Sequence, residues 1–425
     1  MTKMSALCNS LIKWSAFSTG LIAFLIYAPI PPHSTFSETF TFAPNRPLTE
    51  KLGLEEKLDN AELWHKGDLL GPETFSDYKG ELYTSLFTGE VVKFKKDGSM
   101  VTVVRTGQTC KGEFEERICG RSMGIKFDRD GSMFVADAYY GIFKVDVETG
   151  EKVMLISPND PIDGKNPKLF NSISLSKNGD IYWSDSSTEF NFEDVVYDML
   201  SDPSGRLIHY NAKSRKNTVL INKLAFANGV FLSHNEEVVL VAETGRNRIH
   251  RYYLKGPKNG TKDIFIDGLP GMPDNIQSDG QGGYLVALYM AVDDNNPSIL
   301  QILGDKPTIR KLLAKAMGLV ELVFQIFDNI YSTQFFQRAM HFIGHCNSIY
   351  FLAPSRASVL HISKDGEILD SLHNLNKHIS LLSEAYIFEN MLYLGTPFND
   401  YIARIPLFKI GWKALERTKE DQNPK

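Results

Sequence analysis

The stretch Asn228-Gly-Val-Phe-Leu-Ser-His-Asn-Glu-Glu-Val-Val-Leu-Val-Ala-Glu243 carries the pattern that decides the fold. It opens with a polar residue, passes through an Asn-marked turn and ends in an apolar strand. Similar or weaker copies recur mostly about fifty residues apart, at Met123–Asp137, Asn171–Asp185, Asn275–Leu288, Glu73–Ser85 and Ser383–Leu394. A four-stranded blade needs roughly 40–50 residues, so six copies predict an all-β protein, a six-bladed β-propeller.

The repeat is interrupted between Tyr289 and His361, where apolar residues recur at helical spacing. We expect a helical insertion at about residues 299–345 inside the fifth blade. The insertion either packs over one propeller face and buries its apolar stripe, or it forms a lid or a membrane-facing element. The stripe comprises Leu312, Leu313, Ala316, Leu319, Val320, Val323 and Phe324, and the second interpretation rests on Phe324, Phe327, Phe335, Phe336 and Phe342.

The segment Trp14–Ile30 holds seventeen residues without a charge and is expected to form a transmembrane signal anchor. A cleaved signal peptide is the alternative, but Ala28 is followed by Pro29 and makes a poor cleavage site. Lys3 and Lys13 precede the segment, which predicts a single-pass type II protein whose propeller is lumenal or extracellular, at the endoplasmic reticulum or plasma membrane. The expected order is cytosolic tail 1–13, anchor 14–30, stalk 31–60, propeller 61–410 and carboxyl-terminal tail 411–425.

Two cysteines and a glycosylation sequon are consistent with a propeller on the lumenal or extracellular side of the membrane. Cys110 and Cys119 bracket a polar loop, a natural position for a disulfide in an oxidising compartment. Asn259 opens the sequon Asn-Gly-Thr in a loop that could carry a glycan. The net charge of −5, with both signs interspersed, gives no indication of a nucleic-acid partner.

The first positions of the repeats are candidate metal ligands, because equivalent positions in a propeller converge on the central channel. They include Glu73, Asn171, Asn228, Asp274 and Asn275. All five offer oxygen donors, and two carboxylates would balance a divalent charge, so the set predicts a Ca²⁺ site. The alternative is that the asparagines bond the local backbone at strand starts. Whether the calcium is catalytic or structural stays open at this point.

Three acidic residues close the apolar strands of the repeat, namely Asp137, Asp185 and Glu243. They either line the channel at a deeper level or cap turns and pair with Arg246 and Arg248. We favour the structural role.

Several ordered motifs make the chain similar to the strictosidine synthase-like family. They are Cys119-Gly-Arg-Ser-Met-Gly-Ile125, Phe134-Val-Ala-Asp-Ala-Tyr-Tyr-Gly-Ile142, Ile181-Tyr-Trp-Ser-Asp-Ser-Ser187, Asp202-Pro-Ser-Gly-Arg-Leu207, Phe226-Ala-Asn-Gly-Val230, Val241-Ala-Glu-Thr244 and Leu269-Pro-Gly-Met-Pro-Asp-Asn-Ile276. The resemblance implies a six-bladed propeller behind one amino-terminal anchor and distant kinship with paraoxonases and other calcium-dependent lactonases and arylesterases. It implies the same five metal ligands and a family disulfide at Cys110–Cys119.

Two departures from these relatives bear on the activity. Ser383 stands where strictosidine synthases carry their catalytic glutamate, with Glu384 one residue out of register, so alkaloid synthesis is not expected. Met123 stands where paraoxonases carry a histidine, and a thioether cannot act as a general base.

The leading hypothesis is a membrane-anchored, calcium-dependent esterase that acts on a small ester or lactone. A metal-bound carboxylate, Asp274 or Glu73, would activate water. The alternative hypothesis is a non-catalytic propeller with structural calcium, which binds a protein or lipid partner.

Overall fold

The computed structural model describes residues 2–352 and 354–416. The chain divides into two compact units. A helical unit comprises Met1–Thr41, Glu193–Asp202 and Ile299–Ser348, and a propeller unit comprises Phe42–Phe192, Pro203–Ser298 and Ile349–Lys425.

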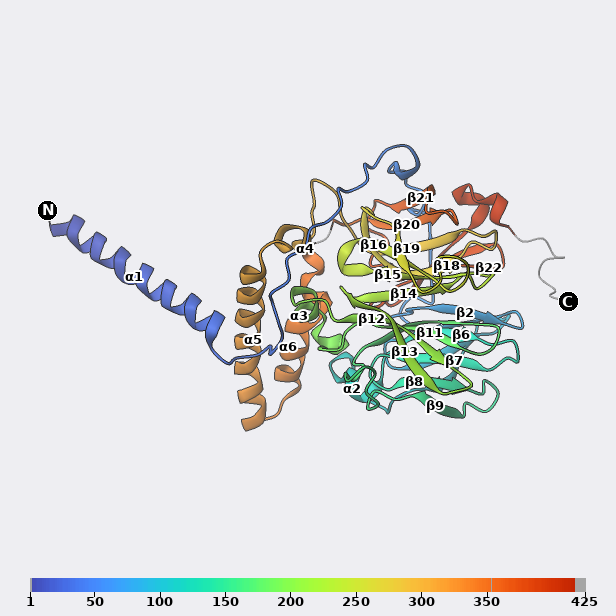
Figure 1. Ribbon diagram of the computed structural model, residues 1–425, viewed down its shortest axis with the longest axis horizontal. Coiled ribbons are helices and arrows are strands. Elements are labelled where there is room, and N and C mark those ends of the chain that lie inside the picture. The colour runs from blue at the N-terminus through green and yellow to red at the C-terminus, as the bar shows by residue number, and fades with distance from the viewer. Residues whose placement is uncertain (1, 353, 417–425) are drawn as a thin grey trace. The chain divides into compact units, whose positions relative to one another are not determined.

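The propeller unit contains six four-stranded antiparallel sheets, as the repeat predicts (Figure 1). Blade 1 consists of β2 (Phe75–Tyr78), β3 (Glu81–Ser85), β4 (Glu90–Phe94) and β5 (Met100–Arg105). Blade 2 consists of β6 (Ser122–Phe127), β7 (Met133–Asp137), β8 (Gly141–Val145) and β9 (Lys152–Ile156). Blade 3 consists of β10 (Phe170–Leu175), β11 (Ile181–Asp185), β12 (Gly205–Asn211) and β13 (Lys216–Leu224). The short helix α2 (Glu116–Cys119) precedes β6.

Blades 4 to 6 complete the ring. Blade 4 consists of β14 (Ala227–Leu232), β15 (Val238–Glu243), β16 (Arg248–Tyr253) and β17 (Lys262–Ile266). Blade 5 consists of β18 (Gly271–Ser278), β19 (Tyr284–Ala291), β20 (Ala357–Ile362) and β21 (Ile368–Asn374). Blade 6 consists of β22 (Glu384–Phe388), β23 (Met391–Gly395), β24 (Ile402–Pro406) and β1 (Glu62–Trp64). The inner strands β2, β6, β10, β14, β18 and β22 contact one another in that order, and β22 contacts β2.

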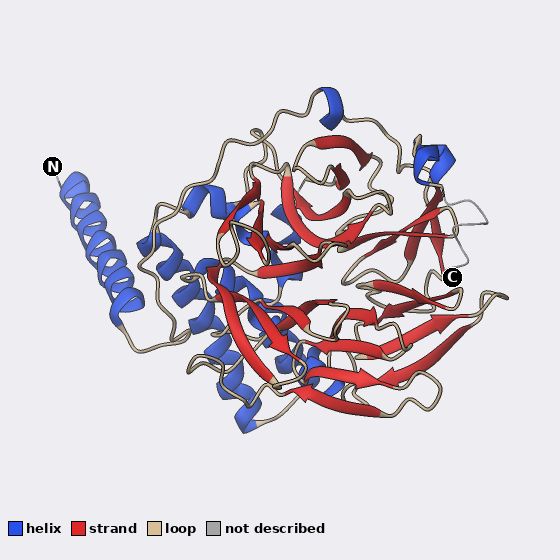
Figure 2. Ribbon diagram, turned by 45° about the vertical axis from the view of Figure 1, so that its right-hand side comes forward, coloured by secondary structure: helices blue, strands red, loops and turns tan. Residues whose placement is uncertain are grey.

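The ring closes because its last sheet takes a strand from each end of the propeller sequence. β1 pairs antiparallel with β24, with Glu62 opposite Arg404 and Trp64 opposite Ile402. Trp64 packs against Phe94 of blade 1 and Tyr393 of blade 6, so its ring joins the first blade to the last. Figure 2 shows the strands of the propeller unit in red.

The core lies between neighbouring blades, which explains the apolar strands of the repeat. Every residue of β7 and of β11 is buried, because both faces of a second strand are covered by adjacent sheets. The segment expected as a stalk also reaches this core. Its second half packs against the propeller through Leu52 and Leu58, both almost fully buried.

The helical unit contains α1 (Thr2–Tyr27), α3 (Val195–Leu200), α4 (Ile299–Leu303), α5 (Pro307–Ile330) and α6 (Gln334–Gly344). The last three lie between β19 and β20 in the chain, where the insertion in the fifth blade was predicted. Pro307 occupies the first turn of α5, where its missing N–H costs nothing, and the Thr333 hydroxyl accepts a hydrogen bond from Phe336 N at 3.3 Å to begin α6.

The helical unit differs from two expectations that the sequence raised. In the part of the chain that the structure describes, no helix combines the length and the apolar character that a membrane span requires. The interpretation that the insertion buries its apolar stripe is wrong for Leu313, Val320 and Val323, whose side chains are exposed. The buried positions of α5 are instead Arg310, Ala314, Lys315 and Gly318.

Candidate metal centre

The five predicted ligands lie on or next to the inner strands of four blades. Glu73 precedes β2, Asn171 and Asn228 are the second residues of β10 and β14, and Asp274 and Asn275 lie in the middle of β18. None is more than 5% exposed.

Several contacts connect these residues across the ring. The Asn228 side chain hydrogen-bonds the Asp274 carboxylate, which also interacts electrostatically with Glu73. Ser383 of blade 6 links blades 1 and 5, because its hydroxyl donates to Glu73 O at 2.6 Å and its carbonyl accepts from Asn275 N at 3.0 Å. Ser383, expected to replace a catalytic residue, thus holds the backbone of two candidate ligands.

Asn171 is connected to the same region through a serine. Its Nδ2 donates to Ser186 Oγ at 3.0 Å, and that hydroxyl donates to Ala227 O at 2.6 Å, directly before Asn228. The amide nitrogen of Asn171 is therefore used by the protein and its orientation is fixed.

Four candidate ligands each have one buried side-chain oxygen without a hydrogen-bond partner. These atoms are Glu73 Oε2, Asn171 Oδ1, Asn228 Oδ1 and Asp274 Oδ1. A buried acceptor that is left unsatisfied costs about 1–3 kcal/mol. Asn275 leaves its Nδ2 unpaired, and a half-turn of that amide would exchange the nitrogen for its oxygen.

This pattern distinguishes the two interpretations of the asparagines. If Asn171 and Asn228 served only to bond the local backbone, their side-chain oxygens would accept hydrogen bonds from nearby N–H groups. Neither does so. Two carboxylates and three amides without histidine or cysteine form a donor set that fits a hard divalent cation, and calcium in particular.

The electrostatics of the two carboxylates also fit a cation. Burial raises the pKa of Glu73 to about 7, although Arg121 opposes this shift. Burial, together with the neighbouring Glu73, raises the pKa of Asp274 well above its ordinary value. Two buried acids repel each other in the ionised state, and a dication between them would remove that penalty.

Arg121 was not among the predicted site residues, yet it lies beside Glu73. Its Nη2 is 3.5 Å from Glu73 Oε2 and donates to Pro397 O at 2.6 Å. The guanidinium carbon also lies 4.0, 4.9 and 5.2 Å from the ring centroids of Phe87, Phe192 and Phe398. These rings fix the cation, so it orients the Glu73 carboxylate. Because the rings come from three distant segments, the local sequence gives no signal for this role.

Glu384 belongs to a second buried cluster. Its carboxylate accepts hydrogen bonds from Phe75 N and from Gln277 Nε2, and Gln277 Oε1 accepts from Lys126 Nζ at 2.9 Å. Both oxygens of Glu384 therefore have protein partners, and burial raises its pKa. Met123 is almost fully buried on β6.

The structural role that we favoured for the strand-end acids is confirmed. Asp185 accepts two hydrogen bonds from Arg206, at 2.7 and 3.0 Å. Glu243 accepts from Arg248 at 2.6 Å and pairs with His250 at 2.7 Å. Asp137 accepts from the backbone N–H groups of Arg121, Tyr139 and Tyr140.

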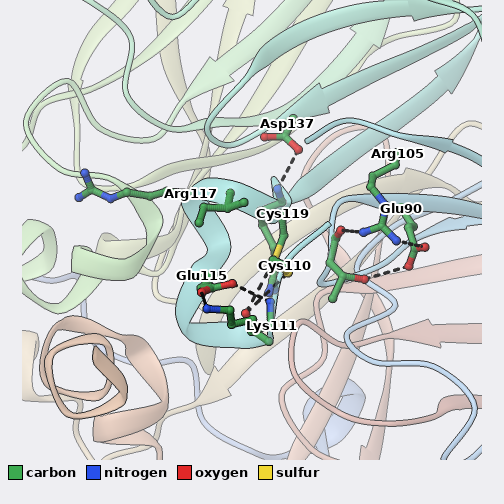
Figure 3. Close-up of a disulfide and its surroundings, with 12 residues drawn as sticks. Glu90, Arg105, Cys110, Lys111, Glu115, Arg117, Cys119 and Asp137 are labelled. Atoms are coloured by element: carbon green, nitrogen blue, oxygen red, sulfur yellow. Dashed lines mark hydrogen bonds and ion pairs between the residues drawn. A yellow bond between two sulfur atoms is a disulfide. The ribbon is translucent and has the colours of Figure 1, made fainter. Parts of the chain in front are cut away.

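The predicted disulfide between Cys110 and Cys119 is present, and Figure 3 shows it below Asp137. Cys119 is fully buried and lies two residues before Arg121. The disulfide thus fixes the loop that leads into the arginine beside the candidate metal ligands. The remaining described thiol, Cys346, is buried and not in a disulfide.

Comparisons with known proteins agree with the motif resemblance. The strictosidine synthase family model matches residues 171–257, and the strictosidine synthase-like, N-terminal model matches residues 55–94. The chain is 38% identical over 395 residues to adipocyte plasma membrane-associated protein Hemomucin of Drosophila melanogaster, covering 92% of this chain and 68% of the relative. It is 33% identical over 392 residues to adipocyte plasma membrane-associated protein of Rattus norvegicus, covering 91% and 95%.

A solved structure shows the same fold. The gluconolactonase of Xanthomonas campestris superposes with a TM-score of 0.51 at 12% identity, covering 89% of this chain and 99% of that chain. At this identity the likeness concerns the fold, a propeller, and not the reaction.

Proposed function

The chain belongs to the adipocyte plasma membrane-associated protein family, and from this premise we propose that it is a membrane-associated, calcium-dependent hydrolase of small esters or lactones. The observation that carries the proposal is the set of buried oxygens without hydrogen-bond partners on Glu73, Asn171, Asn228 and Asp274. Four blades supply these atoms, and their chemistry fits calcium.

The residues that would hold the metal are Glu73, Asn171, Asn228, Asp274 and Asn275. When bound, calcium would polarise the ester carbonyl and stabilise the oxyanion that forms on attack by water. The carboxylate of Asp274, whose Oδ1 has no hydrogen-bond partner in the protein, or that of Glu73 would accept the proton of the attacking water. Arg121 would keep the Glu73 carboxylate in place while the proton is taken up.

Other nucleophiles and bases fit this chain less well. Glu384 has both oxygens engaged by Phe75 N and Gln277, and the Met123 thioether has no basic nitrogen. The one Gly-x-Ser-x-Gly stretch of the sequence is Gly120-Arg-Ser-Met-Gly124, but its Ser122 is fully buried at the start of strand β6 and does not lie on a strand-to-helix turn, so a serine-based hydrolase elbow is not proposed.

The alternative function is a binding propeller whose calcium is structural. Met123 favours it, because a histidine base of the paraoxonase type is missing at that position. In that case the four blades would still need the cation to neutralise Glu73 and Asp274, but no ester would be turned over.

Turnover of phenyl acetate by the full-length chain in detergent tests the proposal. We expect hydrolysis that disappears after chelation of calcium and returns when calcium is restored, with the fold followed by circular dichroism. The isosteric change Asp274→Asn should lower kcat/KM by about 10²-fold or more. The matched control Asp263→Asn changes a carboxylate on the surface strand β17 that pairs with Arg251, and should leave turnover unchanged.

A folded, calcium-loaded protein without turnover would contradict the hydrolase. If calcium still raised the melting temperature of that inactive protein, and Asp274→Asn removed the rise, the binding propeller with structural calcium would be supported.

A further inference from the structure

Helix α5 has its polar and apolar faces reversed relative to a helix that packs on a core. Its buried positions are Arg310, Ala314, Lys315 and Gly318, two of them cationic. A helix on a globular protein normally turns its Leu, Ile, Val and Phe side chains inward and its charges outward. The reversal therefore needs a physical reason.

The buried face binds backbone carbonyls of the helical unit. Arg310 donates to Leu200 O at 2.8 Å, to Ser201 O at 3.1 Å and to Glu38 O. Lys315 donates to Ile30 O. These contacts orient α5 by hydrogen bonds from charged donors, which are stronger than those from neutral donors.

Gly318 tightens the same contact. A Cβ atom at this position would overlap the carbonyl oxygen of Pro31, so only glycine lets the extended segment lie this close to α5. With this face fixed, the opposite face has to point away from the unit.

That opposite face is a continuous apolar stripe. It comprises Ile309, Leu313, Val320, Val323, Phe327 and Ile330, which are between 37% and 77% exposed. At 3.6 residues per turn they fall within an arc of roughly 100°. Tyr331, Phe335 and Phe342, also exposed, continue the apolar surface into α6. An exposed patch of this kind marks a site that binds another apolar surface.

The neighbourhood of the stripe indicates a lipid surface as the occupant. The stripe adjoins a second apolar element, because α1 contacts α5 and itself exposes Trp14, Phe17, Phe24 and Tyr27. Of the five Lys and Arg from Ile299 to Gly344, Arg310 and Lys315 lie on the buried face, so the other three balance the three Asp and Glu of this segment. Two adjoining apolar helix faces without an excess of acidic charge suit the interface of a bilayer.

We propose that the apolar face of α5 and α6 docks on the surface of a phospholipid bilayer, in the plane of the headgroups. This contact is separate from any anchoring by α1 and does not depend on the hydrolase activity. It would hold the chain on the membrane at two places and restrict its orientation.

Nitroxide labels on the full-length chain test the proposal, in vesicles of phosphatidylcholine and phosphatidylserine. Val320→Cys and Ile330→Cys place the label on the stripe, and Gln325→Cys is the matched control, since Gln325 is exposed on the opposite side of α5. Cys8 and Cys346 are replaced by Ser in all three variants. Accessibility to oxygen reports contact with lipid, and accessibility to a water-soluble nickel complex reports contact with water.

We expect the two labels on the stripe to lose nickel accessibility several-fold relative to the label at position 325, and to gain oxygen accessibility. Equal nickel accessibility at all three positions would overturn the proposal, even if α1 kept the chain on the vesicles. Labels on the stripe that are shielded from both oxygen and nickel would also overturn it, because a second protein copy would then cover the stripe.

Discussion

At the scale of single residues, the buried carboxylates of the propeller differ in whether the protein supplies a counter-charge. Asp185 and Glu243 are paired with Arg206 and Arg248, and Arg121 lies 3.5 Å from Glu73. Asp274 has no cationic side chain within ion-pair distance among the described residues. A buried charge needs a partner, so Asp274 is the carboxylate that a bound cation would stabilise most.

Glu243 gives a prediction for acid stability. Burial opposes ionisation, but hydrogen bonds from His250 and Arg248 outweigh it and lower the pKa of Glu243 to about 2. Because the folded pKa lies below the unfolded value, the stabilisation of about 3 kcal/mol is complete above about pH 4.5 and is lost as the pH falls toward 2.

The change Glu243→Gln should therefore lower the free energy of unfolding at pH 6 and reduce its dependence on pH between 4.5 and 2. Urea unfolding of both proteins at several pH values measures this. A variant that loses stability in acid as steeply as the parent would show that another group dominates that range.

At the scale of elements, glycines let neighbouring strands approach at the ligand positions. A Cβ atom at Gly124 would lie 2.7 Å from Asn171 O, and one at Gly395 would lie 2.7 Å from Glu73 O. At Gly229 the added carbon would overlap Asp274 O. The three glycines come from three blades, and each touches the backbone of a candidate ligand in the next one. The spacing of neighbouring blades around the candidate ligands is thus set by missing side chains.

Gly229→Ala should separate β14 from β18 at Asp274 and weaken calcium binding. Overpacking of this kind costs about 1–3 kcal/mol of stability. Calcium titration followed by calorimetry should show a lower affinity, beyond any loss of stability in thermal unfolding.

Gly80→Ala is the control for this substitution. Gly80 has a positive φ of 74° and no neighbour within 4 Å of an added Cβ, so alanine there costs only about 1–2 kcal/mol of backbone strain. Its calcium affinity should equal that of the parent. If both variants bound calcium normally, the close approach at Gly229 would have no role in the site.

At the scale of the whole molecule, the fold joins segments that are far apart in the sequence. β1 and β24 close the ring, and the candidate ligands come from four blades. Asn259 lies in the exposed loop between β16 and β17, on the rim of the fourth blade. The topology expected from the sequence would place this loop in the lumen or outside the cell.

The topology predicts a glycan on Asn259 in cells that glycosylate. Digestion with a peptide N-glycosidase should lower the apparent mass of the parent chain, whereas Asn259→Gln should already run at the lower mass. The substitution should not change thermal stability, since the side chain is exposed. A parent chain without glycan, digested by protease added to the cytosolic side of sealed microsomes, would contradict the topology.

The sequence by itself determined the six blades, the place of the helical insertion and the disulfide, because period, helical spacing and cysteine spacing are local properties of the chain. It also predicted the five candidate ligands, since equivalent repeat positions must converge in a propeller. Only the tertiary structure decided that aromatic rings surround Arg121 beside Glu73 and that α5 exposes its apolar stripe. It also decided that Gln277 donates a hydrogen bond to Glu384 while it accepts one from Lys126. Each of these depends on partners from distant segments, and a local pattern does not specify which segment covers a given side chain.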